Sequence, residues 1–185
     1  RIERAGRATP EILREITPIK TLFLLQRPPR IALLGPGGAG KAELLCALFN
    51  AELLKPGEEN LNEGTWVKFS RGGQGALQLL DARRPVSAQL VKAAIAEQAP
   101  DLFIFARPAR EIDEGLTADL EHAEQLLSFA ESRHETKARV LGVLLAGSGD
   151  PESARQELNS CLHTREPISQ RMLGTVALGG ADAAS

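Results

Sequence analysis

The sequence predicts an α/β fold in which a mostly parallel sheet carries helices on both faces. Short apolar runs with the length of buried strands alternate along the chain with longer segments whose apolar residues recur every three or four positions. The chain has 185 residues, enough for one such domain and too few for two. Its apolar content of 43% and charged content of 25% are typical of a globular domain.

The expected elements follow one another in an order typical of this class. Strand-like runs lie at residues 31–34, 65–70, 76–81, 102–106, 140–146 and 174–178. Helical faces lie between them at residues 44–49, 86–95, 116–130 and 151–162. The glycine-rich residues 71–75 join the second and third runs, which predicts an antiparallel hairpin. Every other connection contains a helix, so the remaining strands are expected to be parallel.

The first 29 residues are expected to form a helical extension in front of a domain at residues 30–185. Thr9 and Pro10 are typical of a helix start, and Pro18 is expected to kink or stop that helix. Four apolar residues of the extension either pack on this domain or dock on a partner protein or a membrane surface: Ile19, Leu22, Phe23 and Leu24.

Charge and composition narrow the function classes. A net charge of −2 and the lack of Tyr give neither a basic footprint nor stacking platforms for nucleic acid. No apolar stretch approaches the roughly 20 residues of a membrane span. Cys46 and Cys161 are expected to be buried thiols in a reduced compartment, and the three histidines to be surface residues. We therefore expect a cytoplasmic protein that does not bind nucleic acid, with peripheral membrane contact only through the N-terminal helix.

The sharpest motif is a glycine-rich loop between the first strand and the first helix. It consists of Gly35, Pro36, Gly37, Gly38, Ala39, Gly40 and Lys41. Glycines let backbone N–H groups point at an anion, and the helix that follows presents free N–H groups and the positive end of its dipole. Lys41 is expected to reach the outer phosphates of a nucleotide. The alternative, a turn that only links strand to helix, fits the flanking elements less well.

The residue after the lysine departs from the phosphate-loop pattern. Magnesium is normally held there by a Ser or Thr hydroxyl, and this chain has Ala42. A methyl group cannot ligate a cation. We therefore expect a magnesium site that is weak or absent.

From about Arg30 onward the chain resembles the Era/dynamin-like (TRAFAC) branch of the P-loop GTPases. Residues 40–50 look like that family's Gly-Lys-Ser followed by Leu-Leu-Asn-Ala-Leu-Phe-Gly. Gly64 and Thr65 are similar to the first switch, in which a Thr closes over magnesium and the terminal phosphate. The resemblance implies a three-layer P-loop NTPase (Rossmann-like) sheet with one antiparallel strand, and GTP or GDP as ligand. It also implies a last helix beyond Ser185.

The remaining motifs of the family are expected at three further places. Residues 81–84 stand where the family carries Asp-x-x-Gly, and residues 147–150 where it carries Asn-Lys-x-Asp. Asp81 and Asp150 are retained, so Asp81 is a weak candidate for holding magnesium through water and Asp150 for reading guanine. Ala177 matches the Ser-Ala position that touches the base.

Several reactive positions are replaced. Arg84 stands at the Gly whose N–H meets the terminal phosphate, and no Gln or His follows Asp81 to orient a water. Arg83 is either an internal arginine finger or, together with Arg84, a solvated side chain. The second is favoured, because a finger contributes little without magnesium. The acidic run at residues 111–124 is expected to be a solvated helix face.

These replacements predict a degenerate GTPase, one that binds guanine nucleotide, hydrolyses it slowly or not at all, and serves as a binding or regulatory module with a protein partner. One alternative is a scaffold that binds no nucleotide. A second is a small nucleotide kinase, whose loop resembles residues 35–41. The short spacing between Lys41 and Asp81 disfavours it, because such enzymes insert a substrate domain there.

Overall fold

The computed structural model describes residues 27–37, 40–49, 54, 63–71, 75–108, 115–135, 138–145 and 151–178. The strands are β1 (Arg30–Leu34), β2 (Trp66–Arg71), β3 (Gly75–Asp81), β4 (Leu102–Pro108), β5 (Arg139–Leu145) and β6 (Met172–Leu178). The helices are α2 (Lys41–Phe49), α3 (Ala88–Glu97), α4 (Leu116–His134), α5 (Pro151–His163) and α6 (Glu166–Ser169). The predicted extension at residues 1–29 falls almost entirely outside the described residues.

The six strands form one sheet in the order β2-β3-β1-β4-β5-β6. Strand β2 runs antiparallel to β3, as the hairpin pattern predicts, and every other neighbouring pair is parallel. Strand β1 lies between β3 and β4, so the loop that follows it emerges at the middle of the sheet. Parallel strands end at the same edge, and the residues that follow β1, β3 and β4 therefore lie close together.

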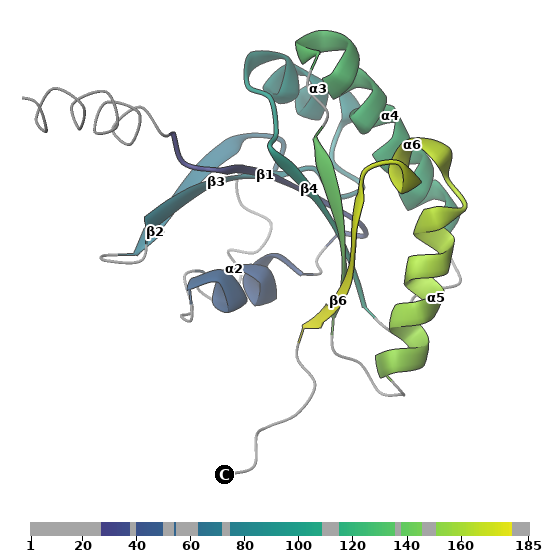
Figure 1. The fold of residues 1–185 in the computed structure, drawn as a ribbon. Coiled ribbons are helices and arrows are strands. Elements are labelled where there is room, and N and C mark those ends of the chain that lie inside the picture. Colours follow the sequence, from purple (N-terminus) through teal and green to yellow (C-terminus); the bar gives the residue numbers. More distant parts are fainter. Residues whose placement is uncertain are drawn as a thin grey trace, which may run out of the picture.

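Helices cover both faces of the sheet, which gives three layers (Figure 1). Helix α2 packs on one face through Leu44, Leu45 and Phe49. Helices α3, α4 and α5 pack on the other. Strand β1 is buried on both sides, because Leu33 faces α2 and Leu34 faces α4. This two-sided burial explains why the central strands read as continuous apolar runs rather than alternating ones.

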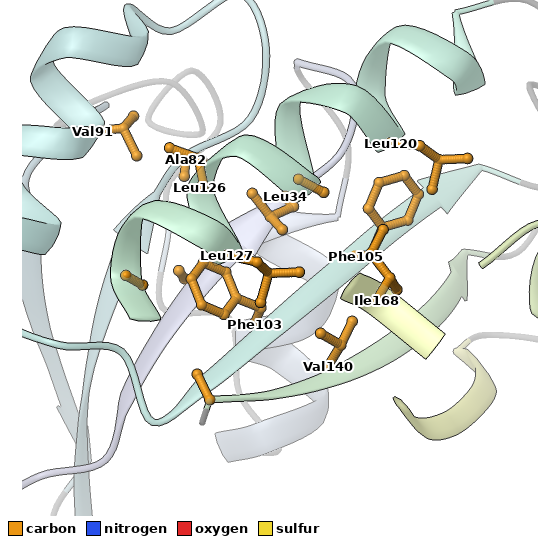
Figure 2. Packing of buried hydrophobic residues seen from close by; sticks show 14 of the residues in the cluster. Leu34, Ala82, Val91, Phe103, Phe105, Leu120, Leu126, Leu127, Val140 and Ile168 are labelled. Carbon is orange, nitrogen blue, oxygen red and sulfur yellow. The ribbon is translucent and has the colours of Figure 1, made fainter. Parts of the chain in front are cut away.

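The larger core lies between α4 and the central strands (Figure 2). Leu120 and Leu127 of α4 lie beside Phe105 and Phe103 of β4, Leu126 lies beside Ala82, and all of these residues are buried. Leu120, Ala123, Leu127 and Ala130 recur every three or four positions, so they share the face of α4 that is buried.

The structure differs from the sequence prediction at several positions. Helix α3 begins at Ala88, so Val86 precedes it, and α6 was not predicted because four residues carry no helical period. Cys46 is exposed, in contrast to the expected buried thiol, because its face of α2 points away from the sheet. His122 and His134 are partly buried rather than on the surface, and each is hydrogen-bonded to a backbone carbonyl.

None of the helices in the described ranges is both long and apolar enough to cross a membrane.

Replacing Leu127 with Ala tests the importance of the α4 core. Leu127 is 1% exposed, and we expect the substitution to lower the free energy of unfolding by about 2–5 kcal/mol, because it leaves a cavity. Leu90→Ala on α3 is the matched control, since Leu90 is 58% exposed and its loss should cost about 0.5 kcal/mol or less. Chemical denaturation measures both. Equal losses in the two variants would contradict this assignment of the core.

Candidate phosphate-binding site

The glycine-rich loop runs from the end of β1 to the start of α2 against the end of β4. Gly35 and Gly40 have φ values of 124° and 86°, a region that side chains rarely adopt. A Cβ at Gly35 would lie 2.0 Å from the carbonyl oxygen of Ala106, and one at Gly40 would lie 2.9 Å from the Cβ of Ala106. The glycines are therefore required by the close approach of this loop to β4. Gly38 and Ala39 are not among the described residues.

The backbone after β3 runs beside the first half of this loop. Ala82 N–H donates to the carbonyl of Leu33 (2.9 Å), and Arg84 N–H donates to the carbonyl of Gly35 (3.0 Å). A Cβ at Gly37 would lie 2.5 Å from the Arg84 carbonyl oxygen. The β1–β3 ladder thus continues past the ends of both strands. It uses the Arg84 N–H, which stands at the position that meets the terminal phosphate in the family's pattern.

Three charged side chains meet at the base of the loop, and we call Lys41, Asp81 and Arg83 the Asp81 cluster. Arg83 donates Nε–H to Oδ1 (2.8 Å) and Nη2–H to Oδ2 (2.7 Å) of Asp81, a bidentate pair. Lys41 Nζ lies 3.3 Å from Oδ2. All three side chains are buried, with exposed fractions of 3% or less. Arg83 is therefore not the solvated side chain that the sequence favoured.

Both oxygens of the Asp81 carboxylate are already engaged by cationic side chains. A carboxylate offers about four lone-pair positions. Oδ2 accepts from Arg83 Nη2–H and forms an ion pair with Lys41, and Oδ1 accepts from Arg83 Nε–H and from Arg83 backbone N–H (3.4 Å). Ala42, at the second magnesium position, carries no oxygen. The residues present therefore do not fit the magnesium ion that the fold implies.

Groups of three or more His, Cys, Asp or Glu side chains that could hold a metal are likewise absent from the described ranges.

A second buried carboxylate fixes the segment that follows Arg83, and we call Arg84, Arg107 and Asp119 the Asp119 cluster. Arg84 Nε–H donates to Asp119 Oδ1 (2.5 Å), and Arg107 Nη1–H donates to Oδ2. Asp119 and Arg107 are buried, and Arg84 is partly exposed. The cluster joins the ends of β3 and β4 to the first turn of α4. Asp119 thus departs from the solvated face expected for residues 111–124. The sequence did not reveal its burial, because its partners Arg84 and Arg107 lie on other elements.

His122, one turn further along α4, was not predicted to contribute to this region. It donates Nε2–H to the carbonyl of Ala82 (3.0 Å). Nothing in its sequence context distinguishes it from a surface histidine, because its partner is backbone from a distant strand.

Of the remaining predicted site residues, the structure describes Thr65 and Ala177 but not Asp150. Gly64 N–H donates to the backbone carbonyl of Asp81 (2.8 Å), which brings the exposed Thr65 to the same edge of the sheet. Ala177 is exposed on β6 and pairs with Leu144 near the end of β5. Asp150 lies outside the described residues, so its predicted contact with guanine stays a prediction.

Side chains at the start of α5 tie that helix to β6. Arg155 donates to the backbone carbonyl of Thr175 (3.2 Å) and forms a two-point pair with Glu152. Hydrogen bonds from Arg155 and Gln156 lower the pKa of Glu152 to about 2, so this carboxylate is ionised at neutral pH. An acidic side chain in the first turn also complements the helix dipole.

Comparison with known proteins identifies the fold. The sequence matches no protein-family model, and no curated protein matches it. Toc33 from Arabidopsis thaliana in complex with Mg²⁺ and GMPPNP superposes with a TM-score of 0.56 at 13% identity, over 94% of this chain and 78% of that one. The Toc33 complex with GDP and Mg²⁺ gives 0.51 at 15%, over 90% and 76%. Era in complex with MgGDPNP and part of 16S ribosomal RNA gives 0.51 at 14%, over 82% and 51%.

The chain therefore has the fold of the P-loop GTPases, as the resemblance in the sequence predicted. Its six-stranded sheet with one antiparallel strand and its helices on both faces match that fold.

Replacing Asp81 with Asn tests the Asp81 cluster. The substitution leaves two buried cations without their carboxylate, and we expect a loss of about 3–5 kcal/mol in the free energy of unfolding. Asp101→Asn is the control, because Asp101 pairs with Arg27 where both side chains are 43% exposed and should cost about 1 kcal/mol or less. Denaturation at neutral pH measures both. A loss no larger for Asp81→Asn than for the control would contradict the cluster.

Proposed function

We propose that this domain binds a guanine nucleotide at the loop formed by residues 35–41 and hydrolyses it slowly or not at all. It would then serve as a binding or regulatory module. The observation that carries the proposal is the phosphate loop, which keeps its strand, its left-handed glycines and its lysine at the start of a helix within a GTPase fold.

Phosphate binding is supported by the electrostatics around this loop. Helix α2 begins at Lys41, and its first N–H groups and dipole favour an anion at that end. Lys41 and Arg83 are two buried cations that both contact Asp81 at the base of the loop. Cationic side chains in this position are suited to phosphate oxygens.

Slow turnover is supported by the internal contacts of Asp81 and of the Arg84 backbone N–H. Phosphoryl transfer depends on a positioned metal, a positioned water and donors aimed at the terminal phosphate. The lone pairs of Asp81 are used by Lys41 and Arg83, and the N–H of Arg84 is used by Gly35. Because Arg83 spends two guanidinium N–H groups on Asp81, its contribution as an arginine finger would be small.

A nucleotide-free scaffold remains the second candidate, and one observation favours it. Lys41 already has a buried carboxylate partner, so the loop does not need a phosphate to neutralise its lysine. In that case the first 29 residues and the loops near the site would contact a protein partner. The same extension would provide any contact with a membrane surface, and the domain would act in the cytoplasm. The nucleotide kinase alternative is not favoured, since the antiparallel β2–β3 hairpin belongs to the GTPase class.

Replacing Lys41 with Met tests the binding site. We expect wild-type protein to bind fluorescent GDP and GTP in preference to ATP, and Lys41→Met to weaken guanine-nucleotide binding by about tenfold or more, or 1.4 kcal/mol. Lys68→Met is the control, because Lys68 is exposed on the outer strand β2. Equilibrium titration followed by fluorescence anisotropy measures the affinities, and single-turnover assays measure hydrolysis.

Three results would count against the proposal in different ways. If wild-type protein bound none of the three nucleotides, the scaffold would be preferred. If ATP bound as tightly as GTP, guanine recognition would be wrong. Hydrolysis as fast as that of an ordinary enzyme, with a median turnover of about 10 s⁻¹, would rule out a degenerate site.

A further inference from the structure

We infer that Arg83 takes the place of the magnesium ion, so that the site binds a guanosine diphosphate without metal and gains nothing from a third phosphate. This inference rests on the proposed function, and it adds the phosphate class that the site accepts and the residue that determines it. Three features of the Asp81 cluster and its surroundings carry it.

The first feature is the geometry of the Asp81 carboxylate. In a magnesium site of this fold, that carboxylate holds the ion through water. Here the planar guanidinium of Arg83 donates to both oxygens of Asp81, at 2.8 and 2.7 Å. Arg is suited to this role, because its fork matches a carboxylate at two points and its charge does not depend on pH within the ordinary range. The arginine is covalently part of the chain, so the charge is permanently present at the loop.

The second feature is the amount of charge. A magnesium ion brings two positive charges to a phosphate site, whereas a guanidinium brings one. The Asp81 cluster therefore offers less compensation than a metal-loaded site with the same lysine and carboxylate. A diphosphate carries less negative charge than a triphosphate, so the weaker positive charge of this site favours the diphosphate.

The third feature is the missing donor for a terminal phosphate. Arg84 N–H donates to Gly35, and the Arg84 side chain is held by Asp119, so this backbone does not turn toward a third phosphate. Arg107 holds the other oxygen of the same Asp119. Moving Arg84 would break one bond to the loop and take one of two cations away from the buried Asp119 carboxylate, which is costly. The segment after β3 is thus fixed in an arrangement that does not recognise a terminal phosphate.

The decisive experiment compares affinities with and without metal. Wild-type protein is titrated with GDP and with a non-hydrolysable GTP analogue, first in EDTA and then in excess Mg²⁺. We expect the GDP affinity to change by less than about threefold between the two conditions, and the GTP analogue to bind no more tightly than GDP. Arg83→Gln should weaken metal-free GDP binding by about tenfold or more. Arg139→Gln, an exposed arginine at the start of β5, is the matched control and should bind as wild type.

A variant designed to restore a magnesium site provides a second test of the role of Arg83. The double variant Arg83→Gln, Ala42→Ser removes the guanidinium and supplies the missing hydroxyl. We expect Mg²⁺ to strengthen its GDP binding by about tenfold, because Asp81 then loses its contacts with the Arg83 guanidinium and can accept from metal-bound water.

The outcomes separate this inference from the proposed function. Wild-type binding that strengthens about tenfold with Mg²⁺, or a GTP analogue that binds about tenfold more tightly than GDP, would overturn the role of Arg83 and leave nucleotide binding intact. Metal-free binding unchanged in Arg83→Gln would also overturn it. Thermal unfolding shows whether that variant folds. If it does not, the affinities of wild-type protein for GDP and for the GTP analogue, with and without Mg²⁺, still test the inference. Absence of guanine-nucleotide binding in both conditions would instead overturn the proposed function.

Discussion

The organisation of this site depends on one buried carboxylate, Asp81, which holds Lys41 and Arg83 at the base of the phosphate loop. Charged groups withdrawn from water are costly unless they are paired and hydrogen-bonded, so each of these three side chains constrains the other two. The pairing holds the lysine at the first position of α2 against the end of β3, and it engages the carboxylate through which a GTPase of this fold holds magnesium. The same interaction thus organises the base of the loop and bears on the proposed loss of the metal.

Asp119, in the first turn of α4, forms a second buried cluster of the same kind. Like Asp81 it is buried and contacts two cations, and the two clusters hold consecutive arginines, Arg83 toward α2 and Arg84 toward α4. Successive side chains of an extended strand point to opposite faces, so one short segment after β3 is anchored on both sides of the sheet. In a switching GTPase this segment must move when the terminal phosphate is lost. Here the anchors oppose such motion, which agrees with the proposed function as a module whose conformation does not depend on the terminal phosphate.

The sheet order, the antiparallel strand and the position of the loop are those of the P-loop GTPases, while the Asp81 side chain and the Arg84 backbone N–H are engaged in internal contacts. The fold and the chemistry depend on different residues. The fold depends on buried apolar strands and on glycines that the close approach of β4 requires. Catalysis in this class of protein depends instead on a few polar groups that are available to a ligand.

The sequence by itself determined the order of strands and helices and the position of the glycine-rich loop. Apolar runs and helical spacing predicted the strands and the long helices, the glycine-rich turn predicted the hairpin, and Gly35 to Lys41 predicted the loop, because each of these is a local pattern with a local physical cause. The partners of Arg83, Arg84, His122 and Asp119 depended on the tertiary structure. Each of these side chains is charged or polar, and the sequence suggested solvent exposure for all of them. Burial and pairing arise only where strands and helices distant in sequence meet, as Asp81 meets Lys41 from α2, and Asp119 meets Arg84 across 35 positions.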